Sequence, residues 1–243
     1  MAIDLAKRTE KVTISLKKRG ILTAPTVRVG LAFDKSGSTE HLYSSGVMSE
    51  TNDRLLAVAN RFDDNGEMDM WSFTTRAFRL KPANEASYGN YVKRHILQNP
   101  NIDQSGGTKY APVIEDMERF YFGEPTLSVA KDIVGLFQGL FKKTPEKVEK
   151  LNSTALPAFC IIVTDGTNSD RAETATVLRR AAKLPIYWLF VGVGDECEFE
   201  FIQEMGEELP NVGFVNLHSL DISDENLYEK VITEEFCEWV KNF

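Results

Sequence analysis

The chain has 243 residues, of which 42% are hydrophobic and 26% are charged, and its formal net charge is −8 at pH 7. This length suits one large α/β domain or two small ones with a substantial core. The negative charge disfavours a general nucleic-acid binder, whose affinity depends on neutralising phosphates with Lys and Arg.

The N-terminal sequence gives no sign of export. Residues 1–7 lack the apolar stretch of a signal peptide, and no window of about twenty residues is apolar enough to span a bilayer. We therefore expect a cytoplasmic protein with no membrane partner. The cysteines Cys160, Cys197 and Cys237 are widely spaced, which indicates buried reduced thiols rather than a disulfide framework or a CxxC site.

Residues 1–24 are expected to form a basic N-terminal arm or an extra edge strand. Val12, Ile14 and Leu16 alternate with polar residues, which predicts a strand in this part of the chain. The preceding residues 2–10 are also compatible with a helix.

Charge is distributed unevenly between the two ends of the chain. Residues 1–20 carry six Lys or Arg against two Asp or Glu, whereas residues 195–243 carry two against fourteen. The acidic end is typical of a solvated face, and the alternatives are that it binds the basic arm or a basic partner.

Two apolar, β-prone runs each stop at an aspartate, as expected of buried parallel strands. The first is 27–33, followed by Asp34, and the second is 159–164, which ends immediately before Asp165. Further strands are expected at 68–73, 186–191 and 212–217.

Helical patterns separate these strands. Apolar or small residues recur at three- and four-residue steps after the first strand, at Met48, Thr51, Leu55, Val58 and Phe62. Similar patterns predict helices at 110–121, 168–183, 197–208 and 223–241.

The alternation of strands and helices predicts a single doubly wound α/β domain over residues 25–243, with a mainly parallel sheet and helices on both faces. A segment at about 123–155 is longer than an ordinary helix-to-strand connection. Its apolar residues fall on one helical face, so we expect a helical insertion there. Ligands of such sheets bind at the carboxyl ends of the strands.

Three short fragments contribute oxygen donors to one end of this sheet. They are Asp34-Lys35-Ser36-Gly37-Ser38, Gly106-Gly107-Thr108 and Thr164-Asp165-Gly166. Because Asp34 and Asp165 follow two strands of the same parallel sheet, we expect the first and third fragments to meet. Carboxylates and hydroxyls suit a hard divalent cation, and a partner or water can complete the coordination shell.

The three fragments, in this order, resemble the metal-ion-dependent adhesion site (MIDAS) of von Willebrand factor type A domains, which have a Rossmann-like fold. The resemblance covers roughly residues 25–241. The runs 61–66, 106–114, 184–188 and 190–195 are similar to the TerF-like type, the intracellular von Willebrand A proteins of bacterial tellurium-resistance systems. In that family a calcium-binding domain can precede the A domain, and because only about twenty-five residues precede the first predicted strand, we do not expect such a domain here.

The resemblance implies a specific set of metal ligands. Ser36, Ser38 and Thr108 would supply hydroxyl oxygens, while Asp34 and Asp165 would bind directly or through water. The expected ion is Mg²⁺, with Mn²⁺ as a possible substitute, because few carboxylates and retained waters suit a small octahedral ion. The remaining position would take an Asp or Glu carboxylate from another protein.

Two further expectations concern residues beside these ligands. Gly37 and Gly107 would let the backbone approach the ion, since glycine has no Cβ. Strand alternation places Lys35 opposite to Asp34, toward solvent or a partner's surface.

The resemblance implies a non-catalytic protein-binding module in tellurite or general stress response. Clustered thiols are absent, so tellurite reduction by this chain is not expected. One alternative is a Mg²⁺-dependent phosphoryl-transfer or hydrolytic enzyme with Asp34 as nucleophile, although Ser36 stands where such enzymes carry a second acid. Another is a structural subunit whose partner contacts are metal-independent. The sequence leaves the oligomeric state open.

Overall fold

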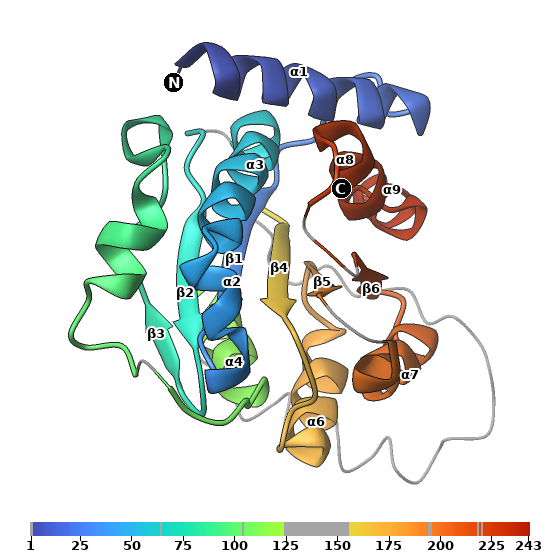
Figure 1. Ribbon diagram of the computed structural model, residues 1–243. Coiled ribbons are helices and arrows are strands. Elements are labelled where there is room, and N and C mark those ends of the chain that lie inside the picture. The colour runs from blue at the N-terminus through green and yellow to red at the C-terminus, as the bar shows by residue number, and fades with distance from the viewer. Residues whose placement is uncertain are drawn as a thin grey trace, which may run out of the picture.

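The computed structural model describes residues 2–63, 65–103, 105–123, 156–193, 196–217, 219 and 221–243 (Figure 1). The helical insertion expected at about 123–155 therefore lies outside the described residues, apart from Gly123. Among the described residues, no helix is long and apolar enough to cross a membrane.

A six-stranded sheet forms the centre of the molecule, in the order β3-β2-β1-β4-β5-β6. The strands are β1 (Arg28–Asp34), β2 (Asp69–Phe73), β3 (Ala77–Arg79), β4 (Ala158–Thr164), β5 (Ile186–Gly192) and β6 (Val212–Asn216). All neighbouring pairs are parallel except β2 and β3, which are antiparallel. The predicted α/β fold with a mainly parallel sheet is confirmed.

The α-helices are α1 (Ala2–Lys18), α2 (Glu40–Ser44), α3 (Val47–Phe62), α4 (Ala111–Phe122), α6 (Arg171–Ala181), α7 (Glu200–Glu208), α8 (Asp224–Val231) and α9 (Glu234–Val240). Single turns of 3₁₀-helix are labelled η1 (Gly37–Thr39), η2 (Glu85–Ser87) and η4 (Glu196–Phe199). A π-helical turn, labelled η3, spans Lys93–Leu97.

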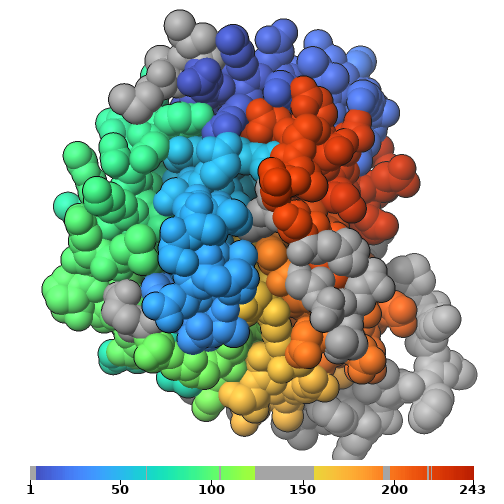
Figure 2. All heavy atoms as spheres, viewed as in Figure 1, coloured from blue at the N-terminus to red at the C-terminus, as the bar shows by residue number. Residues whose placement is uncertain are grey.

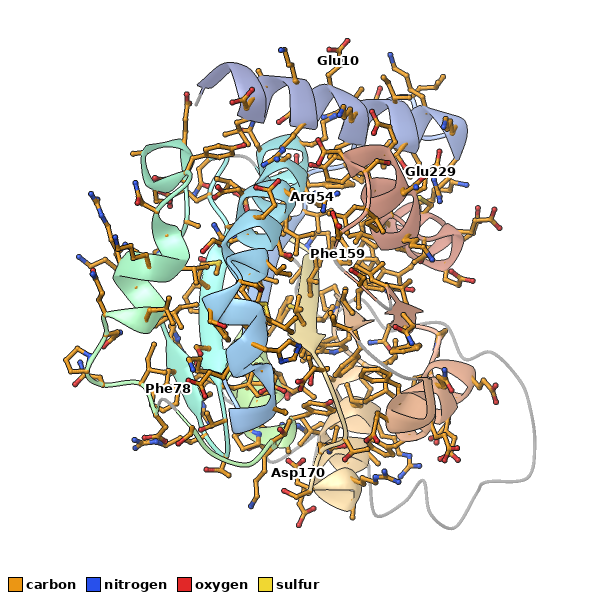
Figure 3. The ribbon with its side chains drawn as sticks, viewed as in Figure 1. Glu10, Arg54, Phe78, Phe159, Asp170 and Glu229 are labelled. Atoms are coloured by element: carbon orange, nitrogen blue, oxygen red, sulfur yellow. The ribbon has the colours of Figure 1, made fainter. Side chains whose placement is uncertain are left out.

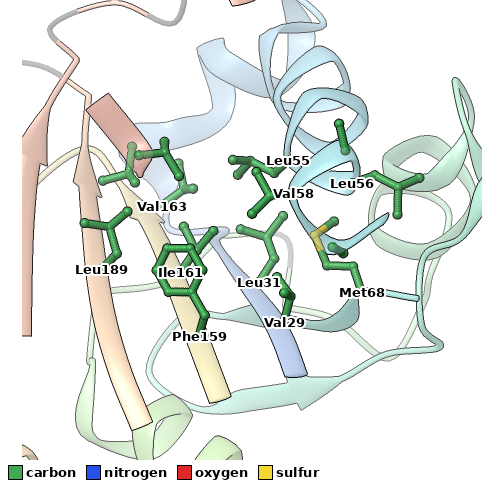
Figure 4. Packing of buried hydrophobic residues seen from close by; sticks show 14 of the residues in the cluster. Val29, Leu31, Leu55, Leu56, Val58, Met68, Phe159, Ile161, Val163 and Leu189 are labelled. Atoms are coloured by element: carbon green, nitrogen blue, oxygen red, sulfur yellow. The ribbon is translucent and has the colours of Figure 1, made fainter. Parts of the chain in front are cut away.

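Helices cover both faces of the sheet, and each face has its own apolar core. In β1, Leu31 belongs to the core formed with α1, α3, α8 and α9, whereas its neighbour Ala32 belongs to the core formed with α4, α6 and α7. Figure 4 shows Leu55 and Val58 of α3 packed over Leu31 on the first face. The two-sided burial explains why β1, β4 and β5 are apolar along nearly their whole length.

The N-terminal segment is a helix, so the edge strand predicted around Val12 is wrong. Leu5, Val12 and Leu16 are buried at helical spacing, whereas Ile14, which completed the alternating pattern, is 48% exposed. The alternation of apolar and polar residues around Val12 therefore does not reflect a strand. The apolar residues that are buried are those that share one face of the helix.

Helix α1 binds the acidic C-terminal region, which was one of the alternatives for that region. Lys11 forms ion pairs with Asp224 and Glu225, and Lys18 pairs with Glu229. Figure 2 shows the blue N-terminal helix and the red C-terminal helices in contact at one end of the molecule. Part of the charge asymmetry is thus neutralised within the chain.

Two other details differ from the prediction. Residues 223–241 form two helices rather than one, because Thr233 lies in extended conformation and its hydroxyl accepts a hydrogen bond from Phe236 N, which starts α9. The short strand β3 has no counterpart among the predicted strands. Only three residues long and not fully buried, it lacks a strong apolar pattern.

Candidate metal centre

Asp34 occupies the carboxyl end of β1 and is fully buried. Its Oδ1 accepts a hydrogen bond from Ser36 N at 2.8 Å, and its Oδ2 accepts one from Thr164 Oγ1 at 2.7 Å. The register of β1 and β4 pairs Phe33 with Val163, so Asp34 and Thr164 come last on adjacent strands. The sheet topology therefore brings the first and third fragments together, as predicted.

Serine hydroxyls link the two aspartates. Ser36 Oγ lies 3.1 Å from Ser38 Oγ, and Ser38 Oγ donates a hydrogen bond to Asp165 Oδ1 at 2.9 Å. The loop that carries these serines is braced by Thr39, whose hydroxyl reaches the carbonyls of residues 34 and 36. Four of the five predicted ligand residues thus form one hydrogen-bonded group of oxygens.

The fragment with Thr108 approaches this group through its backbone. Gly37 N donates a hydrogen bond to Gly106 O at 3.2 Å, and the Thr108 carbonyl accepts hydrogen bonds from both N and Oγ of Ser169. Thr108 is therefore held between the loop after β1 and the loop after β4. All three predicted fragments lie at the same end of the sheet.

Both carboxyl groups of the site have raised pKa values. Burial raises the pKa of Asp34 from its ordinary 3.8 to about 6, and the negative charge of Asp165 adds to the effect. Burial also raises the pKa of Asp165, against the hydrogen bond from Ser38. The hydrogen bonds that these carboxylates accept come from neutral hydroxyl and N–H groups, so a bound cation would relieve the cost of their burial.

The donor chemistry of the site fits a hard divalent cation. Two carboxylates and nearby hydroxyls offer oxygen alone, which suits Mg²⁺ or Mn²⁺ better than softer ions. The described residues contain no group of three or more His, Cys, Asp or Glu side chains placed to hold a metal. A metal at this site would therefore depend on hydroxyl or water oxygens in addition to the two carboxylates.

One expectation about a residue beside the ligands needs revision. Lys35 is only 3% exposed, and its Nζ lies 4.8 Å above the ring of Tyr43, so the prediction that it faces solvent is wrong. Burial lowers its pKa. Among the glycines of the three fragments, Gly106 has the least room, since a Cβ there would lie 3.2 Å from Thr74 Cβ, whereas a Cβ at Gly37 would meet nothing within 4 Å.

Three residues that support the site were not predicted from the sequence. Tyr110 places its hydroxyl 3.1 Å from Thr164 Oγ1, and Tyr43 donates a hydrogen bond to the Asp34 carbonyl at 2.8 Å. Asp170 is buried at the start of α6 and binds the start of α4 (Figure 3). The only signal in the sequence is the position of Asp170 in the first turn of the helix predicted at 168–183, which does not indicate that its carboxylate binds the start of another helix.

Comparison with known proteins places the chain among von Willebrand A domains. The model of a family described as von Willebrand A domains found in the TerF C terminus matches residues 26–130 and 136–243. The uncharacterized protein YcbR of Bacillus subtilis (strain 168) is 31% identical over 244 residues, which cover 98% of this chain and 86% of YcbR.

Solved structures show the same fold at low sequence identity. Proximal thread matrix protein 1 from the mussel byssus aligns with a TM-score of 0.53 and 12% identity over 87% of this chain and 48% of its own. The pilus adhesin SpaC from Lactobacillus rhamnosus GG aligns with a TM-score of 0.53 and 12% identity over 90% of this chain and 30% of its own. This chain therefore spans less than half of each of those longer chains.

Proposed function

This chain belongs to the family of von Willebrand A domains found in the TerF C terminus, and from that premise we propose that it is a non-catalytic, Mg²⁺-dependent protein-binding module. Asp34, Ser36, Ser38, Thr108 and Asp165 would hold the ion, and an Asp or Glu carboxylate of another protein would complete its shell. The observation that carries the proposal is the hydrogen-bonded group of oxygens around the buried Asp34.

Mg²⁺ is the favoured ion because of the number and type of ligands. Two carboxylates leave room for water and for an external ligand, as is usual for a small octahedral ion that dehydrates reluctantly. Mn²⁺ prefers similar oxygen ligands and can substitute. The ion would supply a positive charge at the end of the sheet, and this charge would attract an acidic side chain.

The absence of an acid two residues after Asp34 supports a binding role over a catalytic one. Ser36, two residues after Asp34, directs its hydroxyl oxygen toward Ser38. A phosphoryl-transfer site with Asp34 as nucleophile would need a proton donor there, and a serine hydroxyl is a poor general acid. Tellurite or general stress response in the cytoplasm is the proposed physiological setting, on the basis of the family alone.

Affinity capture with and without Mg²⁺ tests the proposed function. The wild-type chain and two variants would be used as baits in lysate of the cells that make it. Asp165→Ala removes a proposed ligand, and Asp221→Ala is a matched control on an exposed aspartate in the C-terminal region.

We expect a partner that is retained by the wild type and by Asp221→Ala in Mg²⁺, and that is lost in EDTA and with Asp165→Ala. Retention of the same partner in EDTA would favour a structural subunit with metal-independent contacts. Equal retention by Asp165→Ala and the wild type would contradict the assigned site.

A further inference from the structure

Asp170 is a buried carboxylate beside the candidate metal centre, and both of its oxygens are occupied. It is 4% exposed. Oδ1 accepts hydrogen bonds from Tyr110 N at 3.1 Å and from Asn168 Nδ2 at 2.7 Å, and Oδ2 accepts one from Ala111 N at 2.9 Å. Since these donors satisfy both oxygens, Asp170 is not placed to serve as a further metal ligand.

The N–H groups that Asp170 binds belong to the start of α4. Tyr110 is the N-cap residue and Ala111 is the first residue of the helix, so their N–H groups have no partner within α4. A carboxylate at this position also interacts favourably with the positive end of the helix dipole. Asp170 thus caps α4 from a loop that lies about sixty residues further along the chain.

The neighbour of Asp170 in the sequence, Ser169, holds the residue two positions before the N-cap of α4. Ser169 N and Oγ both donate to the Thr108 carbonyl, at 2.9 and 3.1 Å. On the other side, Lys109 N donates to the carbonyl of Thr74, which follows β2, at 2.9 Å. The backbone around Thr108 is therefore fixed to two loops at the carboxyl ends of the strands.

Further contacts connect the segment around Thr108 to the parts of the chain that carry the two aspartates of the site. Asp165 and Asp170 lie five residues apart in the loop between β4 and α6. Tyr110, whose N–H Asp170 binds, reaches Thr164 Oγ1 with its hydroxyl, and Thr164 donates to Asp34 Oδ2. Displacement of the Asp170 carboxylate would therefore move Thr108 relative to Asp165 and loosen a contact of Asp34.

We propose that Asp170 is a positioning residue that sets the Mg²⁺ affinity of the site by holding the Thr108 segment against the loop that carries Asp165. This inference rests on the proposed function, because it assigns Thr108 and Asp165 as ligands. Outer groups that orient metal ligands typically contribute about 10- to 100-fold to metal affinity.

Mg²⁺ titration calorimetry of Asp170→Asn tests this role. Asparagine keeps the shape of the side chain, but it replaces one acceptor oxygen with an NH₂ group that faces N–H donors. We expect the dissociation constant for Mg²⁺ to rise about tenfold or more. An unchanged constant in the folded variant would overturn the inference.

Asp53→Asn is the matched control. Asp53 is also buried, and it accepts a hydrogen bond from a backbone N–H, that of Gly89 at 3.0 Å, and one from an amide, Asn52 Nδ2 at 3.3 Å. It lies in α3 and makes none of the contacts of the site. We expect this variant to lose stability but to keep the wild-type Mg²⁺ affinity, and an equal loss of affinity in both variants would reduce Asp170 to a general structural role.

The double variant Asp170→Asn/Thr108→Ala separates positioning from simple destabilisation. If Asp170 acts through Thr108, the loss of Mg²⁺ affinity caused by Asp170→Asn becomes much smaller once the Thr108 hydroxyl is gone. Additive losses would contradict this mechanism. A wild type that binds no Mg²⁺ would refute the proposed function itself, whereas a wild type that binds Mg²⁺ and is weakened only by Thr108→Ala would refute the role of Asp170 alone.

Ser169→Ala keeps the test decisive if Asp170→Asn does not fold. Ser169 is exposed, and this change removes only its hydroxyl contact to the Thr108 carbonyl. We expect a rise of several-fold in the Mg²⁺ dissociation constant with little change in melting temperature. The wild-type affinity in this variant would count against the inference.

Discussion

Buried or partly buried carboxylates at the two ends of the sheet have pKa values shifted in opposite directions. At the metal-site end, Asp34 accepts hydrogen bonds from a backbone N–H and from a hydroxyl, and burial raises its pKa. At the other end, Asp224 of α8 forms ion pairs with Arg54, Arg8 and Lys11. These cations hold the pKa of Asp224 below its ordinary value despite partial burial.

This difference separates a stabilising contact from a candidate binding site. Asp224 joins α1, α3 and α8, and its charge is balanced by side chains of the fold itself (Figure 3, where Arg54 is labelled). Asp34 is buried at a cost that its neutral hydrogen-bond donors only partly offset. A buried carboxylate with a raised pKa is a candidate for ligand binding, and this observation supports the proposed metal site.

The largest stability effect is expected at the Asp224 end. Arg54 has a side chain that is 4% exposed, and its Nε lies 2.9 Å from Asp224 Oδ1. Breaking a buried ion pair by removing one partner typically costs about 3–5 kcal/mol. Arg54→Met should lower the free energy of unfolding in urea by roughly this amount and leave Mg²⁺ affinity unchanged. A loss of Mg²⁺ binding in the folded variant would show that the two ends are not independent.

The pH dependence of stability should reveal the cost of burying Asp34. Its pKa is raised from 3.8 to about 6, so the folded state binds more protons than the unfolded state between these values. Without metal, the contribution of Asp34 to stability is therefore greatest below pH 3.8 and is lost as the pH rises through about 6. At neutral pH the ionised group costs about 3 kcal/mol.

Denaturation of the wild type and of Asp34→Asn in EDTA, from pH 4 to pH 7.5, measures the cost in stability of ionising the buried Asp34. The wild type should lose stability relative to the variant as the pH rises, since asparagine does not ionise. If the difference in stability between the two proteins is constant with pH, the pKa of Asp34 is not raised by burial.

The contribution of Asp224 to stability should depend on pH in the opposite direction to that of Asp34. The pKa of Asp224 is lowered in the folded state, so its contribution is present above the ordinary pKa and is lost as the pH falls through the lowered value. Comparison of the wild type with Asp224→Asn should therefore show a gap that closes in acid. A gap that widens in acid would contradict the role assigned to Arg54 and its neighbours.

The smallest effect is expected for the exposed pairs between α1 and α8. Lys18 and Glu229 have side chains that are 59% and 42% exposed. Exposed ion pairs contribute little to stability, and their contribution weakens as the salt concentration rises. Lys18→Ala should lower the melting temperature by about a degree or less in 0.5 M NaCl and slightly more at low salt. A large loss at both salt concentrations would show that α1 is held mainly by this pair.

The sequence predicted the structure best where a local pattern follows directly from the fold, as in the apolar strands of a sheet that is covered on both faces. The runs that end at Asp34 and Asp165 are apolar because both faces of the sheet are covered, and such runs are visible without a structure. Parallel topology then places their ends together. These two facts were enough to predict that the first and third fragments meet.

The features that were missed depend on contacts distant in sequence or on very short elements. Nothing near Asp170 indicates that its carboxylate caps a helix about sixty residues away. Lys35 follows the last residue of β1, where strand alternation no longer applies, and the ring of Tyr43 covers it. In α1, two apolar periods coexist, and only packing against α3 and α8 decides between them.

Mg²⁺ titration calorimetry of the metal-free wild type and of Asp34→Asn tests the central claim most directly. The variant keeps the volume of the buried side chain but removes the charge that a cation would balance. We expect one Mg²⁺ bound per wild-type chain and an affinity at least about 100-fold weaker for Asp34→Asn. Equal Mg²⁺ affinities in the two proteins, or no binding by the folded wild type, would contradict it.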